Sequence, residues 1–328
     1  PWEVVGGLAL GGTILLAEGA PDHPGPDRLW AMAERHGVTI LGASPTLVRG
    51  LMKLGEAPVK RHDLSRLRIL GSTGEPWNDA PWSWYFEQVG GGRCPVINFS
   101  GGTEVGACFL SALPITPLKP CSLVGPALGM DVDILGPDGA PLREGVGELV
   151  CKQPWPGMTR GLWGDPDRFL ETYWSRWPGL WVHGDWASRD EDGEWFLHGR
   201  SDDTLNVAGK RIGPAEVESA LVGHPSVAEA AAIGVPDPVK GEAIWCFAVP
   251  RPGAVADEAL RRALCDQVVR ILGKSFMPTR IEFVAELPRT RSAKVLRRAI
   301  RARILGHDPG DLSSLENPRA LNQFAPAR

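Results

Sequence analysis

Two loops rich in small residues follow apolar runs in the first hundred residues. They are GSTGEP at 71–76 and NFSGGTEVG at 98–106. Backbone N–H groups in such loops can approach a phosphate or a purine edge, because few Cβ atoms stand in the way. In the second loop Thr103 offers a hydroxyl to phosphate, and Glu104 offers a carboxylate to Mg²⁺, which prefers oxygen ligands. The alternative is two tight turns with a capping Thr and Glu, which is the commoner origin of such loops.

Two charged segments further along the chain suit the same kind of ligand. In the segment 183–203, Asp185 ends one strand-like run and Arg200 follows the next. A carboxylate suits the two hydroxyls of a ribose, and an arginine suits a phosphate or the same ribose. The segment 288–303 carries seven Arg or Lys and no acid, so it can bring Lys294 to a polyanionic ligand. The alternatives are a hairpin with surface charge and a solvated helix face.

Composition and missing motifs exclude several classes of protein. The 328 residues are 43% hydrophobic and carry a net charge of −4, which fits a globular protein of two or three domains and argues against one that coats nucleic acid. No apolar run of about 18 residues occurs, so no membrane span is expected. The six cysteines form no C-x-x-C pair, which favours a reducing cytoplasm over a disulfide scaffold or zinc ribbon. Neither a complete Walker A loop nor a G-x-S-x-G elbow is present.

The elements that position these residues fall into an order typical of α/β proteins. Over residues 1–107, apolar strand-like runs alternate with helix-like runs, which predicts a parallel α/β sheet. The expected strands lie at 13–19 and 38–45 and in the strand-to-loop runs 67–76 and 95–106, and the expected helices at 26–37 and 45–55. Ligands of such sheets bind at the carboxyl ends of the strands, where both small-residue loops fall.

The remaining chain predicts two further domains and a tail. Residues 108–200 hold short strand-like runs separated by turns such as GPDG and DEDG, which predicts an antiparallel β-subdomain. Residues 201–305 mix strands with helices at 214–225 and 257–273, which predicts a small α+β domain. Residues 306–328 are polar and predict a tail.

Five motifs occur in one fixed order along the chain. They are GSTGEP, NFSGGTEVG, HGDWASRDEDG, GRSDDTLNVAGKRIGPAEVE and PRTRSAK. As an ordered set they resemble the core motifs of the AMP-forming acyl-CoA synthetases of the adenylate-forming superfamily, and most of all the acetyl-CoA synthetase-like or medium-chain branch. The resemblance covers residues 1 to about 305. It implies part of a large N-terminal domain, with a parallel α/β sheet and a β-subdomain, followed by a small α+β lid domain.

The resemblance implies a role for each motif residue in the nucleotide site. Thr103 matches the phosphate-binding threonine and Glu104 the magnesium ligand; Asp185 matches the aspartate on the ribose hydroxyls and Arg200 an arginine that contacts the nucleotide. The residues implied around the adenine are Gly74, Glu75, Pro76, Asn98 and Phe99.

The resemblance also implies roles for residues near the C-terminal domain. Asp202 matches the hinge about which this domain rotates, Gly209 the glycine beside the CoA pantetheine tunnel, and Arg211 an arginine of the hinge-proximal loop. Lys294 matches the lysine required for adenylation. The implied reaction joins a carboxylic acid to CoA at the expense of ATP, with Mg²⁺ as the cofactor and no nucleic-acid partner or membrane span.

The sequence departs from the family pattern at three points. Gly101 stands where acetate-using members carry a tryptophan, so we expect a roomier acyl pocket and an acid longer than acetate. Ala293 stands where a glycine usually precedes the lysine. The family's Ser/Thr/Gly-rich phosphate loop has no counterpart here, so we expect that the chain begins partway through the large domain and is impaired by itself.

Two other functions stay open from the sequence alone. One is an adenylation domain that loads a tethered carrier protein, although no carrier-like D-S-L motif follows the basic segment. The other is a non-catalytic remnant that binds a nucleotide or CoA.

Overall fold

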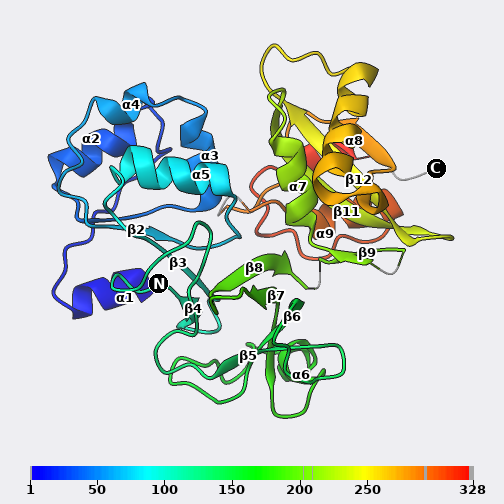
Figure 1. Cartoon of the computed structure of the whole chain (residues 1–328), viewed down its shortest axis with the longest axis horizontal. Coiled ribbons are helices and arrows are strands. Elements are labelled where there is room, and N and C mark those ends of the chain that lie inside the picture. Colours follow the sequence, from blue (N-terminus) through cyan, green and yellow to red (C-terminus); the bar gives the residue numbers. More distant parts are fainter. Residues whose placement is uncertain (1, 202, 209, 292–293, 325–328) are drawn as a thin grey trace. The chain divides into compact units, whose positions relative to one another are not determined.

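The computed structural model of the chain describes residues 2–201, 203–208, 210–291 and 294–324 (Figure 1). These residues divide into two compact units, the first ending at Leu197 and the second beginning at His198. The sequence placed this division after residue 200. The structural division falls three residues earlier because strand β8 (Trp195–Arg200) runs from the first unit into the second.

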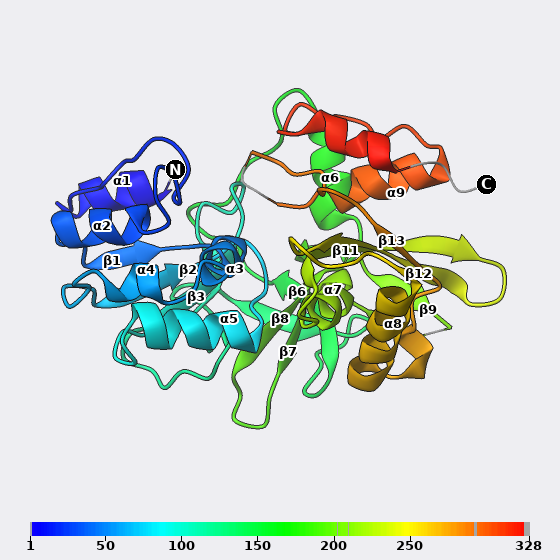
Figure 2. The same ribbon diagram turned by 90° about the horizontal axis from the view of Figure 1, so that it is seen from above.

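The first unit contains a four-stranded sheet in the order β1-β2-β3-β4. Strands β1 (Ile40–Gly42), β2 (Ile69–Ser72) and β3 (Val96–Gly101) are parallel, whereas β4 (Cys108–Ser111) runs antiparallel to β3. The carboxyl ends of β2 and β3 therefore lie at one edge of the sheet, and both small-residue loops begin there. Five helices of this part are labelled in Figure 2: α1 (Trp2–Ala9), α2 (Arg28–Arg35), α3 (Pro45–Met52), α4 (Ala57–Lys60) and α5 (Asp79–Trp84). A π-helical turn (Tyr85–Val89) follows α5.

Local sequence accounts for where α3 begins. The Ser44 side chain accepts a hydrogen bond from the backbone N–H of Leu47 at 3.2 Å, and Pro45 occupies the first helical position.

The hydroxyl of the buried Tyr85 donates to the carbonyl of Leu41 at 2.9 Å, which ties the π-helical turn to β1.

The prediction of a strand at 13–19 is wrong. The structure describes this whole segment and shows no strand in it, and its Leu15 and Leu16 side chains are 43% and 78% exposed. The guanidinium of Arg28 instead binds the carbonyls of Glu18 and Ala20. The apolar composition of this run therefore did not predict a strand correctly, because in the described structure no other strand pairs with it.

A second, antiparallel sheet completes the first unit. Its order is β5-β6-β7-β8, with β5 (Val132–Leu135), β6 (Val146–Cys151) and β7 (Trp181–Arg189) preceding β8. Helix α6 (Pro166–Trp174) begins where the Asp165 side chain accepts from the N–H of Arg168. The core beneath this sheet is built on large rings, including Phe109, Trp155 and Trp181.

The second unit is a five-stranded sheet covered by helices. Its strands are β9 (Leu205–Val207), β10 (Lys210–Ile212), β11 (Val227–Asp237), β12 (Gly241–Pro250) and β13 (Arg280–Phe283). Its helices are α7 (Pro214–Val222), α8 (Glu258–Leu272), α9 (Arg297–Leu305) and two 3₁₀ turns (Lys274–Phe276 and Pro318–Gln323). Among the described residues, every helix is too short or too polar to cross a membrane.

The segment expected to form a tail instead packs into the second unit. Leu315, Leu321 and Phe324 are buried. The rings of Phe324 and Phe247 pack edge to face, with their centroids 4.8 Å apart. The tail was predicted because the segment is polar on average. Burial of these three apolar side chains is nevertheless favourable, so the segment packs against the unit.

Candidate functional site

Two β-bulges lie next to the predicted carboxylates in the first unit. In the β6–β7 ladder, Glu148 pairs with Trp186 and Val150 pairs with Val182. Between these pairs β6 advances by two residues and β7 by four, so β7 bulges over residues 183–185, and Gly184 adopts a φ of +84°. A bulge of this kind bends a strand and changes the direction of its side chains.

The second bulge lies at the end of β3. Ser100 pairs with Leu110 and Gly101 with Cys108, which leaves Phe109 of β4 without an opposite residue in the ladder. The ring of Phe109 meets the imidazole of His183 edge to face, with centroids 4.9 Å apart. The two irregular stretches of backbone are thus in contact through these side chains.

One imidazole lies between the two predicted carboxylates. His183 Nδ1 is 3.8 Å from Glu104 Oε1, and His183 Nε2 is 3.9 Å from Asp185 Oδ2. The His183 side chain is 6% exposed, Asp185 is 14% and Glu104 is 26% exposed. The structure therefore brings Glu104 and Asp185, 81 residues apart in the sequence, to opposite edges of one largely buried ring.

The Glu104 carboxylate is positioned from two further sides. The Tyr173 hydroxyl donates to Glu104 Oε1 at 3.2 Å, and the Tyr173 ring stacks on Trp181 with centroids 4.1 Å apart. The carboxylate also folds over Gly102, where an added Cβ would lie 2.7 Å from Glu104 Oε2. A glycine is thus needed at 102 for the carboxylate to take this position.

These residues fit one mode of magnesium binding. In the described part of the chain, no three His, Cys, Asp or Glu side chains are arranged to hold a metal ion. Mg²⁺ commonly uses one or two carboxylates together with substrate phosphates and water, rather than an all-protein cage. The single, partly exposed Glu104 beside the exposed Thr103 suits that mode.

The first small-residue loop is fastened to its neighbours by Thr73 and Glu75. The Thr73 hydroxyl donates to the carbonyl of Phe99 at 2.8 Å and so links the ends of β2 and β3. Gly74 has a φ of +106°, a conformation that favours glycine. Glu75 accepts from the backbone N–H of Thr46 and from the Arg49 guanidinium, each at 2.8 Å, so its carboxylate anchors the loop on α3.

The other residues expected around an adenine lie in the same loops. Asn98 is 4% exposed and pairs in register with Ser72 of β2, while Phe99 and Pro76 are half-buried. Contact of these residues with adenine stays a prediction.

The prediction of open space beside Gly101 is wrong. An added Cβ would lie 2.3 Å from the carbonyl oxygen of Ala107 and 3.2 Å from the Cα of Cys108. The direction in which an indole would extend is therefore occupied by the backbone of the adjoining strand. This geometry removes the ground for expecting an acid longer than acetate.

The residues expected to serve the C-terminal domain belong to the second unit. Lys294 is exposed, and its N–H donates to the Thr290 hydroxyl at 3.2 Å while its carbonyl accepts from the Thr290 N–H. The exposed Arg200 lies at the end of β8, and the backbone of Arg211 pairs with Asn206. The side chain of Arg211 and the whole of Asp202, Gly209 and Ala293 lie outside the described residues.

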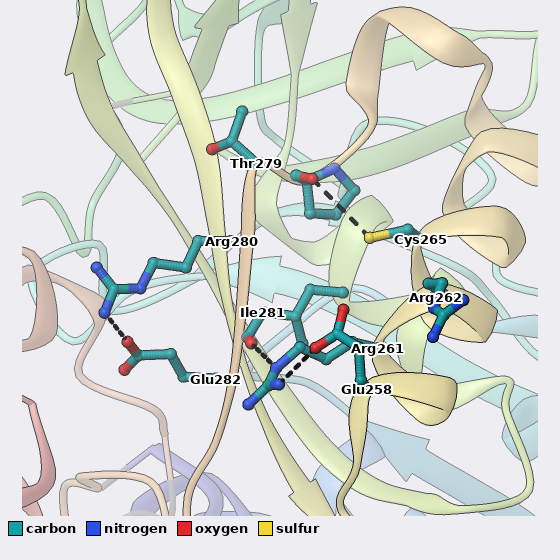
Figure 3. A pocket seen from close by; sticks show the side chains of 9 residues that line it. Glu258, Arg261, Arg262, Cys265, Thr279, Arg280, Ile281 and Glu282 are labelled. Carbon is teal, nitrogen blue, oxygen red and sulfur yellow. Dashed lines mark hydrogen bonds and ion pairs between the residues drawn. The ribbon is translucent and has the colours of Figure 1, made fainter.

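A pocket of about 350 Å³ lies elsewhere in the second unit, between α8 and β13 (Figure 3). It is lined by none of the predicted site residues. Arg261 donates to the carbonyl of Ile281 and to Glu258, each at 2.8 Å, and Arg280 pairs with Glu282. Because acids inside the pocket already engage these two cations, it is a weak candidate for an anion site.

The sequence analysis did not predict two residues of the site, His183 and Tyr173. His183 stands two positions before Asp185 in the same motif, so its proximity was a usable signal. Tyr173 lies at the end of α6 and reaches Glu104 across 69 residues of sequence, which no local pattern indicates.

Two family models match the chain. The model described as AMP-binding enzyme matches residues 1–163, and the model described as AMP-binding enzyme C-terminal domain matches residues 216–294. Together they cover about three quarters of the chain.

Named relatives match along nearly the whole chain. The acetyl-coenzyme A synthetase of Rubrobacter xylanophilus is 48% identical over 98% of this chain and 50% of its own length, and that of Gemmatimonas aurantiaca is 47% identical over 97% and 49%. The solved structure of acetoacetyl-CoA synthetase from Streptomyces lividans matches with a TM-score of 0.86 at 32% identity, over 98% of this chain and 50% of that one. The chain thus spans about half the length of the curated relatives it matches.

Proposed function

Since the chain belongs to the family of AMP-binding enzymes, we propose that it carries nucleotide-binding and lid residues of an AMP-forming acid–CoA ligase. Such a ligase activates a carboxylic acid as its adenylate and then transfers the acyl group to CoA. ATP, the acid and CoA are its substrates and Mg²⁺ is its cofactor. A cytoplasmic location is part of the proposal, because all six cysteines are free thiols, which suits a reducing compartment.

In the first half-reaction, a carboxylate oxygen attacks the α-phosphate of ATP and pyrophosphate leaves. Asp185 accepts hydrogen bonds from the ribose hydroxyls, and the loops at 71–76 and 98–103 line the adenine and contact phosphate through the Thr103 hydroxyl. A magnesium ion held by Glu104 would offset phosphate charge. Lys294 supplies a further positive charge as pyrophosphate departs.

In the second half-reaction, the CoA thiol attacks the acyl carbonyl and AMP leaves. Lys294 is needed only for the first step, so a rotation about Asp202 would move it away and bring Gly209 and Arg211 to the thiol's path. Lid movements of this kind are a common way to order two steps at one site.

One observation carries the proposal. Glu104 lies in the turn that follows β3 of one sheet and Asp185 lies in β7 of the other, yet both are within 4 Å of the same imidazole. One site therefore offers an oxygen ligand for a metal and an acceptor for a ribose diol, as the first half-reaction requires.

A binding experiment on the 328-residue chain tests the nucleotide site. We expect AMP binding by isothermal titration calorimetry, and a loss of about tenfold or more in affinity for Asp185→Asn, because a charged acceptor for two hydroxyls is removed. Asp190→Asn is the matched control, since Asp190 lies just after β7 and pairs with Lys119 instead. Equal affinities for Asp185→Asn and the wild type would contradict the assignment.

A product analysis on the whole protein tests the activity. Incubation with ATP, CoA and carboxylic acids of two to twelve carbons should yield acyl-CoA, AMP and pyrophosphate, detected by mass spectrometry. Acyl-adenylate without acyl-CoA would indicate the carrier-loading alternative. AMP binding with neither product would indicate a non-catalytic remnant.

A further inference from the structure

Residues 314–316, within the segment expected to be a tail, pair with residues 289–291 of the same unit. Thr290 and Leu315 form an antiparallel bridge, and backbone hydrogen bonds of 2.8 and 3.1 Å flank it. The Leu315 side chain is buried, so apolar packing supports the pairing. Backbone hydrogen bonds therefore attach this late segment to residues 289–291.

Lys294 lies along the opposite side of residues 289–291. The Thr290 N–H donates to the Lys294 carbonyl at 2.9 Å, and the Lys294 N–H donates to the Thr290 hydroxyl at 3.2 Å. A neighbouring antiparallel bridge, between Arg289 and Val295, extends this pairing. Residues 289–291 are thus the middle one of three paired segments, and the backbone position of Lys294 depends on where this middle segment is held.

The side chain of Asn317 fastens the start of the middle segment. Its Oδ1 accepts a hydrogen bond from the Arg289 N–H at 2.8 Å. Its Nδ2 donates to the Leu287 carbonyl at 3.0 Å and to the Glu286 carboxylate at 2.7 Å. One amide thus uses its oxygen and its nitrogen together, and two of its three partners are backbone groups just before Thr290. These bonds fix the backbone from which the middle segment continues.

We propose that Asn317 is a positioning residue for Lys294, which it holds in place through residues 289–291. The inference rests on the proposed function, which gives Lys294 its role in adenylation. Without the Asn317 amide, the middle segment loses the side-chain bonds at its start, and the backbone of Lys294 is held less precisely. A displacement of about 1 Å can cost about 100-fold in the rate of a step that needs the displaced group. Only adenylation needs Lys294, so the loss of Asn317 should affect that half-reaction selectively.

Two variants of the whole protein test this role by comparing the half-reactions. Asn317→Ala removes all three side-chain hydrogen bonds, so pyrophosphate release should slow by about tenfold or more. Thioester formation from supplied acyl-adenylate should stay within about twofold of the wild type, because that step does not use Lys294. Gln323→Ala is the matched control, because the Gln323 amide binds the backbone of Ala285 and Glu286 instead, at 2.7 and 3.3 Å. It should leave both half-reactions at wild-type rates.

A conservative variant separates positioning from general destabilisation. Asn317→Asp keeps the oxygen that accepts from the Arg289 N–H, and the exposed Glu286 carboxylate can turn away from the new charge. Part of the adenylation rate should therefore return in Asn317→Asp. A merely structural role would instead slow both half-reactions of Asn317→Ala together.

The outcomes separate this inference from the proposed function. If Asn317→Ala leaves adenylation unchanged, slows both half-reactions equally, or behaves like Gln323→Ala, the inference is wrong and the proposed function stands. If the wild-type whole protein forms no acyl-adenylate, both are wrong. Should Asn317→Ala fail to fold, hydrogen exchange in the wild-type 328-residue chain decides. The N–H groups of Thr290 and Glu316, which join the middle segment to its two neighbours, should exchange at one common rate, and independent rates overturn the inference.

Discussion

Replacing Gly102 by alanine should weaken metal binding at the site and leave the fold intact. The new Cβ would lie 2.7 Å from Glu104 Oε2, whereas ordinary contact begins at 3.4 Å, so the carboxylate must retreat by about 0.7 Å. The Tyr173 hydrogen bond to this carboxylate is already 3.2 Å long and would be lost. A hydrogen bond to a charged group contributes about 1.5–3 kcal/mol, so we expect the affinity for Mn²⁺, which prefers the same oxygen ligands as Mg²⁺, to fall by about 10- to 100-fold.

The same substitution should have little effect on stability. The atoms in the way are the end of a flexible side chain, so the backbone need not move. Mn²⁺ titration of the chain saturated with AMP, which supplies a phosphate ligand, measures the affinity by electron paramagnetic resonance, and urea unfolding measures the stability. Gly50→Ala is the matched control, because it lies within α3 and nothing lies within 4 Å of the added Cβ. That control should keep wild-type Mn²⁺ affinity and gain about 0.5–1 kcal/mol of stability.

The reasoning fails if Gly102→Ala binds Mn²⁺ as tightly as the wild type while remaining folded. It also fails if Gly102→Ala and Gly50→Ala weaken Mn²⁺ binding equally, since the effect would then not arise from the Glu104 carboxylate.

Four further outcomes are expected. In the whole protein, Lys294→Ala should abolish adenylation, followed by pyrophosphate release, and spare thioester formation from supplied acyl-adenylate; equal loss of both half-reactions would contradict its role. Asp202→Pro should slow thioester formation more than adenylation in rapid-quench kinetics, because proline fixes φ near −65° at the hinge; two unchanged rates would show that the chain does not pivot there. Gly101→Ala should lower the urea midpoint, because its Cβ would lie 2.3 Å from a carbonyl oxygen, and an unchanged midpoint would mean that the strand gives way easily. The hydrogen bond to Glu34 raises the pKa of His62, so its stabilising effect is complete below the ordinary pKa of 6.5 and is lost as pH rises through the raised pKa. His62→Phe should therefore flatten the decline in the free energy of unfolding as pH rises above 6.5, and an unaltered slope would refute this.

Elements with a strong local pattern were predictable from the sequence. The helix expected at 26–37 forms as α2, and the run 95–106 contains β3 followed by the Thr103–Glu104 turn. These segments combine a clear period with a turn signal, so few arrangements other than the observed one bury their apolar faces.

The failures share a different cause, which is dependence on distant partners. The run at 13–19 is apolar, but within the described part of the chain it pairs with no strand. The last segment is polar on average, yet Phe324 fits against Phe247 of β12. The blocked direction at Gly101 depends on a bulge in the facing strand, and no composition or spacing in either strand reveals the register shift.

The bulge in β7 also bears on how this site can change over evolution. Its flanking pairs, Glu148 with Trp186 and Val150 with Val182, hold the ladder on both sides of residues 183–185. Because side chains alternate along a strand, gain or loss of a single codon within the bulge would reverse the direction of its side chains while the flanking pairs persist. Homologues that differ in length at this point should therefore differ in the ligand they accept before they differ in fold.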